Sequence, residues 1–286
     1  RPSSLIAFTR FTAKGQERIS GQVIGETRCS LYVNRQEIVA FSCTPQQLHL
    51  LALGFLRSEG LIAGMRDISM LRVYEAIDRV YWYVPALGLD QRLTMRICPE
   101  SVGVVDVRLH RPIAMPTRRV LTSGCGGGIT FDDLSASQLP VYSSVRVTAG
   151  QILDLMRLLT ERASLYRTCR GVHTSLFSNY NGVVVVAEDI GRHNTLDKIQ
   201  GACLKQGLET RDGILVSTGR VSSEMITKAA RMMVPVVVSR SSPTALSCRL
   251  ALEWGITLIG YARGRRMTVY TGGERVVWDP APAAAS

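Results

Sequence analysis

The fold is decided by one stretch in the second half of the chain, Val183-Val184-Val185-Val186-Ala187-Glu188-Asp189-Ile190-Gly191-Arg192-His193-Asn194. Its first five residues are apolar and of strand length, and the polar residues after them lead into a helical pattern from about Asn194 to Lys205. Apolar strands recur at 214–217, 236–238, 256–259 and 267–270, and helical patterns at 222–233 and 243–254 separate the first three of these. This alternation predicts a three-layer α/β part in which a mostly parallel sheet is covered by helices on both faces.

The sequence before this part has a different character. A strongly amphipathic helix is predicted over 148–167, and alternating patterns over 26–42 and 68–110 predict a hairpin with a turn at Asn34-Arg35-Gln36 and an antiparallel sheet. Thr44-Pro45, with Gln47 completing a capping box, predicts a helix that begins at this point and ends at Gly60. Residues 1–20 are mixed and polar, and we expect an irregular segment there. We therefore predict two parts: a smaller, sheet-rich α+β part over 1–140 and the α/β part over 141–286.

Composition restricts the class of protein. The chain has 286 residues, of which 46% are hydrophobic and 20% charged, as in ordinary globular proteins. No apolar run is long enough for a membrane helix, and no signal segment follows Arg1, although we expect a piece to precede that residue. We therefore expect a cytoplasmic protein that does not enter a membrane. The net charge of +11 is spread along the chain and comes largely from arginine, which favours phosphate-bearing ligands over nucleic acid.

One of the seven cysteines stands apart from the others. Cys125 lies in Thr122-Ser123-Gly124-Cys125-Gly126-Gly127-Gly128, with no apolar residue within three positions on either side. Glycines leave a thiol uncrowded, and clustered backbone N–H groups can stabilise a thiolate. A glycine-rich turn with an incidental cysteine explains these residues equally well. The remaining cysteines are scattered and mostly apolar in context, which is typical of core positions.

Polar residues follow successive strands of the predicted sheet. The turns 188–194, 217–224 and 239–244 each contain an arginine, namely Arg192, Arg220 and Arg240. Ligands of open α/β sheets bind beyond the carboxyl ends of strands, so the recurrence indicates a phosphate-bearing ligand. Simpler roles remain open for Asn194 and Ser222 as helix caps, for Asp189 as a turn residue and for His173 as a structural histidine. The segment from Tyr261 to Arg266 is equally compatible with a basic turn and with a phosphate clamp.

The chain resembles the FdhD/NarQ family of formate dehydrogenase accessory proteins. The most specific similarity is the block from Glu188 to Lys198. Shorter similarities are found at 51–62, at Thr122 to Gly126, at Gly171-Val172-His173, at Ser217 to Arg220, at Ser241 to Thr244 and at Gly260 to Gly264. These segments span nearly the whole chain in the order expected for the family.

The resemblance implies a sulfurtransferase that serves formate dehydrogenases. Such a protein takes sulfur from a cysteine desulfurase as a persulfide and passes it to the bis-molybdopterin guanine dinucleotide cofactor, which carries molybdenum or tungsten. A guanine nucleotide is expected to mimic this cofactor in the binding site. The persulfide cysteine corresponds to Cys125. The cofactor-binding segment corresponds to Tyr261, Ala262, Arg263, Gly264, Arg265 and Arg266, and we expect Arg192, His193 and Arg220 to assist in binding. The resemblance further implies a cytidine-deaminase-like fold, a homodimer, and the catalytic subunit of formate dehydrogenase as a partner.

One feature departs from the family. Many relatives have two cysteines in a C-x-x-C arrangement, whereas this chain has Gly128 three residues after Cys125. Because a persulfide needs one sulfur atom as its carrier, we expect Cys125 to carry the sulfur alone. The roles of Glu188 and His193 in proton movement stay open.

Two other classes of function compete with this interpretation. A cofactor-holding chaperone would need the same binding residues but no sulfur chemistry. A deaminase-type zinc hydrolase would need H-x-E and C-x-x-C elements, but His173 is followed by Thr174 and Ser175, and no C-x-x-C is present. We therefore expect no zinc site.

Overall fold

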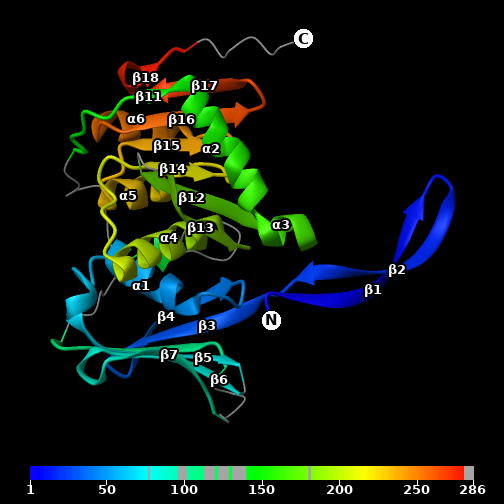
Figure 1. The fold of residues 1–286 in the computed structure, drawn as a ribbon, viewed down its shortest axis with the longest axis vertical. Coiled ribbons are helices and arrows are strands. Elements are labelled where there is room, and N and C mark those ends of the chain that lie inside the picture. The colour runs from blue at the N-terminus through cyan, green and yellow to red at the C-terminus, as the bar shows by residue number, and fades with distance from the viewer. Residues whose placement is uncertain are drawn as a thin grey trace.

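The chain forms two six-stranded sheets with helices packed between them (Figure 1). The computed structural model describes residues 1–76, 78–95, 102–112, 120–121, 129–130, 140–179 and 182–279. Helix α1 (Leu48–Ser58) lies on the N-terminal sheet and packs against α4 (Arg192–Gln206) of the second half. The two halves are therefore joined through a helix–helix contact. The predicted boundary near residue 140 stays a prediction.

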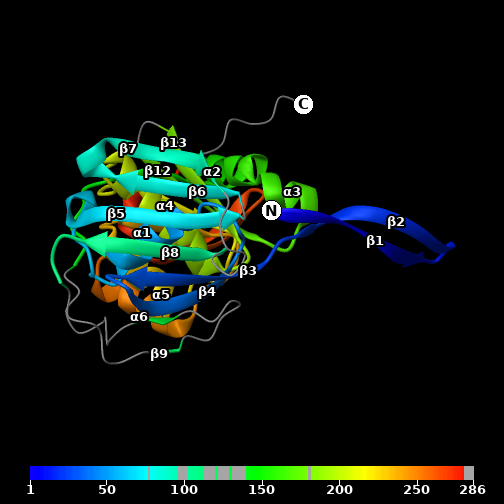
Figure 2. The ribbon, with the colours of Figure 1, turned by 90° about the horizontal axis from the view of Figure 1, so that it is seen from below.

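The N-terminal sheet has the strand order β4-β3-β8-β5-β6-β7, and Figure 2 shows it with β7 and β4 at its two edges. The predicted hairpin and antiparallel sheet are confirmed, except that β3 pairs with β8 in parallel. Alternate residues of β3 and β4 point into the core beneath α1, as the period of two requires. The strands are β3 (Thr27–Val33), β4 (Gln36–Cys43), β5 (Ile68–Ala76), β6 (Arg79–Val84), β7 (Leu89–Thr94) and β8 (Val104–Leu109).

Helix α1 begins later than its capping box predicted. Its first residue is Leu48, and the residue before it, Gln47, has a left-handed φ of 54° with no side-chain cap. Thr44 instead uses its hydroxyl to accept a hydrogen bond from the Ile190 N–H at 3.1 Å. The predicted capping box is therefore wrong, because a partner far along the chain takes the threonine hydroxyl.

The second sheet is mixed rather than mostly parallel. Its order is β13-β12-β14-β15-β16-β17, and β14, β15 and β16 pair in parallel, whereas β12 and β17 run the other way. Strand β12, which the sequence analysis did not predict, lies between β13 and β14 and makes both of its pairings antiparallel. The carboxyl ends of β13, β14, β15 and β16 nevertheless share one edge. The strands are β12 (His173–Asn179), β13 (Gly182–Asp189), β14 (Ile214–Ser217), β15 (Val236–Ser239), β16 (Thr257–Arg263) and β17 (Arg266–Thr271).

Helices cover both faces of this sheet, as predicted. Alternation along β14 and β15 sends Leu215 and Val237 into the core under α4, α5 (Ser223–Arg231) and α6 (Ala245–Glu253). Val216 and Val238 face the other way, toward α2 (Ala149–Arg162). The predicted helix over 148–167 is two helices, since the chain breaks at Ala163 before α3 (Ser164–Cys169). The three-layer α/β arrangement is therefore confirmed, whereas the likeness to cytidine deaminases stays a prediction.

Residues 3–24 form a hairpin arm rather than an irregular segment. Strands β1 (Ser3–Thr12) and β2 (Gly15–Ile24) pair along their full length and project from the body (Figure 1). Two short pairings complete the described strands. They join β9 (Val120–Leu121) to β10 (Ile129–Thr130) and β11 (Val147–Thr148) to β18 (Val276–Val277).

Candidate functional site

The turns that follow β13, β14, β15 and β16 meet at one edge of the second sheet. Backbone hydrogen bonds link neighbouring turns: the Arg240 N–H donates to the Ser217 carbonyl, and the Tyr261 N–H donates to the Ser241 carbonyl, both at 3.0 Å. His173, at the start of the antiparallel strand β12, pairs with Asp189 and so lies at the same edge. The segments that the sequence analysis singled out are thus brought together.

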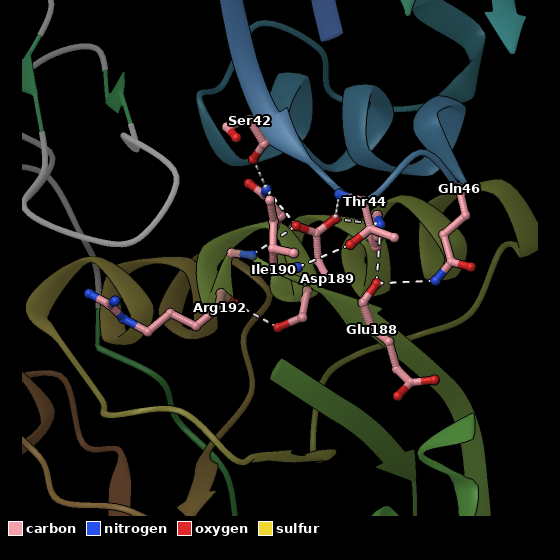
Figure 3. Close-up of polar contacts among 11 residues, drawn as sticks. Ser42, Thr44, Gln46, Glu188, Asp189, Ile190 and Arg192 are labelled. Carbon is pink, nitrogen blue, oxygen red and sulfur yellow. Dashed lines mark hydrogen bonds and ion pairs between the residues drawn. The ribbon is translucent and has the colours of Figure 1, made fainter. Parts of the chain in front are cut away.

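Asp189 is the buried centre of the first turn (Figure 3). Its Oδ2 accepts hydrogen bonds from Lys198 Nζ at 2.6 Å and from the Thr44 N–H at 3.2 Å. Its Oδ1 accepts from the Gly191 N–H and from Asn194 Nδ2, each at 2.9 Å. Four donors neutralise and hold a carboxylate that has no exposure to water.

Asp189 and its four hydrogen-bond donors, which we call the Asp189 cluster, connect the two halves of the protein. Asn194 Nδ2 also donates to the Ser42 carbonyl at 3.0 Å, so the cluster joins the end of β4 to the start of α4. Asn194 is the third residue of α4 and not its cap, which is Gly191. Loss of one partner from a buried ion pair such as Lys198–Asp189 typically costs about 3–5 kcal/mol. The cluster is therefore a structural brace beside the site.

The carboxylate of Glu188 is occupied by a helix end. Its Oε2 accepts from the Leu165 N–H at 2.8 Å and from Ser164 Oγ at 3.0 Å, and its Oε1 accepts from the Tyr166 N–H at 2.9 Å. These donors are the first residues of α3, where a carboxylate satisfies unpaired N–H groups and the helix dipole. A role for Glu188 in anchoring α3 therefore explains its burial.

Two hydroxyls at the ends of β14 and β15 form hydrogen bonds within the protein. Ser217 and Ser239 are fully buried. The Ser217 hydroxyl accepts from the Gly219 N–H at 3.2 Å, and the Ser239 hydroxyl donates to the Gly219 carbonyl at 2.6 Å. These two hydroxyls hold the turns in shape.

Arg192 and His173 lie against Gly219. A Cβ atom at Gly219 would lie 3.0 Å from Arg192 Cβ and 3.3 Å from His173 Nδ1, so a larger residue would require these side chains to give way by a few tenths of an ångström. The Arg192 side chain extends away from the Asp189 cluster (Figure 3). Arg220 follows directly and is exposed. The predicted residues Arg192, His193 and Arg220 therefore lie near one another, at the starts of α4 and α5.

His193 is held as a neutral imidazole. Its Nε2 lies 3.1 Å from Ser222 Oγ, and its Nδ1 lies 3.3 Å from Glu224 Oε2. Burial, together with the positive charges of Arg192 and Lys228, lowers the pKa of His193 to about 3. A neutral ring can accept a hydrogen bond from the Ser222 hydroxyl at Nε2, so this contact exists without a charge on His193.

The segment from Tyr261 to Arg266 borders the face of the second sheet that α2 covers. It contains the end of β16, the two-residue turn Gly264-Arg265 and the first residue of β17; Gly264 has a φ of 61°, and Arg263 pairs with Arg266. Ala262 is buried, whereas the three arginines and Tyr261 are exposed. Ala262, Arg263 and Gly264 line a cavity of about 390 Å³ beside α2, which also contains Arg240 and which we call the α2 pocket.

The predicted site residues thus fall into two groups. Strands β12, β14 and β15 separate β13 from β16, which corresponds to about 19 Å at a strand spacing of about 4.8 Å. Arg192, His193 and Arg220 lead into helices on one face, and the α2 pocket lies on the other. Arg240 lies outside the predicted cofactor-binding set, because nothing in the sequence of its turn indicates which face of the sheet it occupies.

Cys125 lies outside the described residues, but the strands on either side of it are described. Val120 pairs with Thr130 and Leu121 with Ile129, so the two ends of the segment that contains Cys125 are held together. Elsewhere Cys29, Cys43 and Cys203 are buried, as expected of core cysteines, and Cys98 lies outside the described residues. Within the described ranges, no group of three His, Cys, Asp or Glu side chains could hold a metal ion, and no helix could cross a membrane.

Comparison with known proteins identifies the family. The model of the FdhD/NarQ family matches residues 24–277. The chain belongs to the FdhD/NarQ family. A relative named sulfur carrier protein FdhD from Listeria monocytogenes is 31% identical over 271 residues, covering 93% of this chain and 96% of the relative. One of the same name from Bacillus subtilis is 32% identical over 262 residues, covering 91% and 92%.

A solved structure has the same fold as this FdhD/NarQ chain. It is a crystal structure described as a formate dehydrogenase accessory protein from Desulfotalea psychrophila, with a TM-score of 0.72 and 23% sequence identity. The superposition covers 97% of this chain and 100% of that one. At this level of identity the likeness concerns the arrangement of helices and strands.

Proposed function

We propose that this protein is a sulfur carrier for formate dehydrogenase. The observation that carries the proposal is similarity along 93% of the chain to a relative named sulfur carrier protein FdhD. Cys125 is the proposed carrier, because its neighbours within three positions are glycines and hydroxyl residues and leave the thiol uncrowded. Its thiolate attacks the terminal sulfur of a persulfide on a cysteine desulfurase, the sulfur–sulfur bond of the donor breaks, and the donor cysteine leaves as a thiolate.

The proposed acceptor of the sulfur is the bis-molybdopterin guanine dinucleotide cofactor of molybdenum or tungsten, bound as a substrate. The α2 pocket supports this part of the proposal, since Arg240 and Arg263 line it and guanidinium groups bind phosphates well. Tyr261, Arg265 and Arg266 extend the same basic surface. The proposal includes a homodimer in the cytoplasm that meets the desulfurase and the catalytic subunit of formate dehydrogenase in turn.

The persulfide can be measured directly. After incubation with a cysteine desulfurase and cysteine, the intact chain should gain about 32 Da, the mass of one sulfur atom on a nucleophilic thiol. Cys125→Ser should abolish the gain. Cys248→Ser, which removes a half-buried thiol on α6, serves as the matched control and should retain it. In a strain that lacks the native protein, Cys125→Ser should fail to restore formate dehydrogenase activity, and full restoration would contradict the proposal.

A second candidate function is that of a chaperone that holds the cofactor without carrying sulfur. The α2 pocket favours it equally, because phosphate binding there needs no thiol. A chain that binds a guanine nucleotide but gains no sulfur on Cys125 would support this candidate against the first.

A further inference from the structure

A second basic cavity lies where three helices end, far from the α2 pocket. Its volume is about 250 Å³, and its lining includes Arg57 in the last turn of α1, Arg231 at the end of α5, and Gly207 after α4. We call it the helix-end pocket. Helix α4 has 15 residues, so this end lies about 21 Å from its first residue, Arg192, at a rise of about 1.5 Å per residue. The pocket is therefore distinct from the site already described.

The two arginines of this pocket have no hydrogen-bonding partners within the described ranges of the chain. Arg231 Nη1 is buried and donates to no acceptor among the described residues. The pKa of Arg231 is lowered, first by burial and also by the positive charge of Arg57, although Glu59 opposes the shift. A buried donor without an acceptor is costly, and two guanidiniums in one pocket repel each other.

The two arginines complement the dipoles of α1 and α5 from their last turns, but the helix ends do not use them as hydrogen-bond donors. Terminal carbonyls of α1 accept from the N–H groups of Glu59 and Gly60, and those of α5 accept from Met232 and Met233. The carbonyls of Cys203 and Leu204, at the end of α4, accept from Leu208 and Gly207. Backbone groups thus cap all three helices, and the guanidiniums remain available to another acceptor.

We propose that the helix-end pocket binds a small oxyanion, a phosphate group held between Arg57 and Arg231. An oxyanion would supply the missing acceptor for Arg231 and would neutralise the repulsion between the two arginines. The volume of about 250 Å³ is smaller than that of most pockets for drug-sized ligands, which limits the ligand to a single phosphate group or the phosphate end of a larger molecule.

Calorimetric titration of the full chain with inorganic phosphate, at constant ionic strength, tests this site. Arg231→Gln should weaken binding at least about tenfold, because it removes charge-assisted hydrogen bonds and leaves a neutral amide. Arg57→Gln should also weaken binding, and it serves as the second variant if the first does not fold. Arg249→Gln, an exposed arginine on α6, is the matched control and should bind like the unchanged protein.

The source of the phosphate is distinguished by a parallel titration with glycerol phosphate. Tighter binding of inorganic phosphate indicates a site for the free ion, and tighter binding of the ester indicates the end of a larger ligand. Either result supports the site. The proposal is overturned if the unchanged protein shows no binding of either anion above a chloride blank, or if both arginine variants bind as tightly as the control.

Discussion

The ring of His193 remains neutral because the folded protein shields it from water. Its pKa is lowered to about 3, mainly by burial, whereas an unfolded histidine titrates near the usual value of about 6.5. Between these values the unfolded chain binds a proton that the folded chain does not, so acid favours unfolding. The stability that a neutral His193 provides is therefore complete above about pH 6.5 and decreases as the pH falls toward 3.

Replacement of this histidine should make stability less sensitive to acid. When the pH falls from 6 to 5, the unfolding free energy should decrease by about 1 kcal/mol less in His193→Gln than in the unchanged protein. Urea unfolding at each pH measures both decreases. A remaining slope is expected from His49, whose pKa burial also lowers to about 3. The exposed residue His110 provides the control, as His110→Gln should leave the slope unchanged. Equal slopes for His193→Gln and the unchanged protein would show that His193 is protonated in the fold.

Helices α1 and α4 touch through their backbones at two glycines. A Cβ atom at Gly201 would lie 2.0 Å from the Leu50 carbonyl oxygen, and one at Gly54 would lie 1.7 Å from the Asp197 carbonyl oxygen. Gly201→Ala must therefore push the helices apart and should lower the unfolding free energy by about 3 kcal/mol, at the upper end of typical overpacking. Denaturation by urea measures the change.

The control for this substitution is another helical glycine. At Gly150, in the first turn of α2, the nearest atom to an added Cβ is Asp279 Oδ2 at 3.0 Å, the end of a flexible side chain. Gly150→Ala should be neutral or stabilise by up to about 1 kcal/mol, because alanine favours helix. If both substitutions had the same effect, close backbone contact between α1 and α4 would not explain the glycine at 201.

At the level of elements, local pattern predicted most of the fold. The order of strands and helices from β13 to β17 follows from apolar runs and helical spacing, which are local properties. Strand β12 was missed because polar residues from His173 to Ser175 begin it. Thr44 was misinterpreted because its true partner, Ile190, lies 146 residues away.

Only part of the arrangement of the candidate site could be predicted from the sequence. The proximity of Arg192 and His193 follows from their adjacency in sequence and is confirmed. The separation of these residues from Arg263 depends on the face that each turn occupies, which no local pattern encodes. The sequence does not show that the Ser239 hydroxyl is already used within the protein. Its partner, the Gly219 carbonyl, belongs to a neighbouring turn that only the folded structure brings close.

The whole molecule should unfold as one unit despite its two sheets. Separating the halves would expose the α1–α4 contact and two buried ion pairs, Lys198–Asp189 and Lys228–Asp197, each at 2.6 Å. Thr44 and Ser58 contribute hydrogen bonds to these pairs from the N-terminal half. Losing a hydrogen bond to a charged group typically costs about 1.5–3 kcal/mol, and the charges would also lose the cover of α1, so a state with one half unfolded should be scarcely populated.

Tryptophans in the two halves can report on this cooperativity. Trp82 lies on β6 of the N-terminal sheet, and Trp254, buried after α6, reports on the second half. With the exposed Trp278 replaced by phenylalanine, Trp82→Phe and Trp254→Phe each leave one reporter. In each variant the urea midpoint by fluorescence should equal the midpoint by circular dichroism, since one transition moves both signals. Loss of the Trp82 signal before the loss of helix would mean that the N-terminal sheet opens alone, and the contacts of Asp189 and Asp197 would then be too weak to couple the halves.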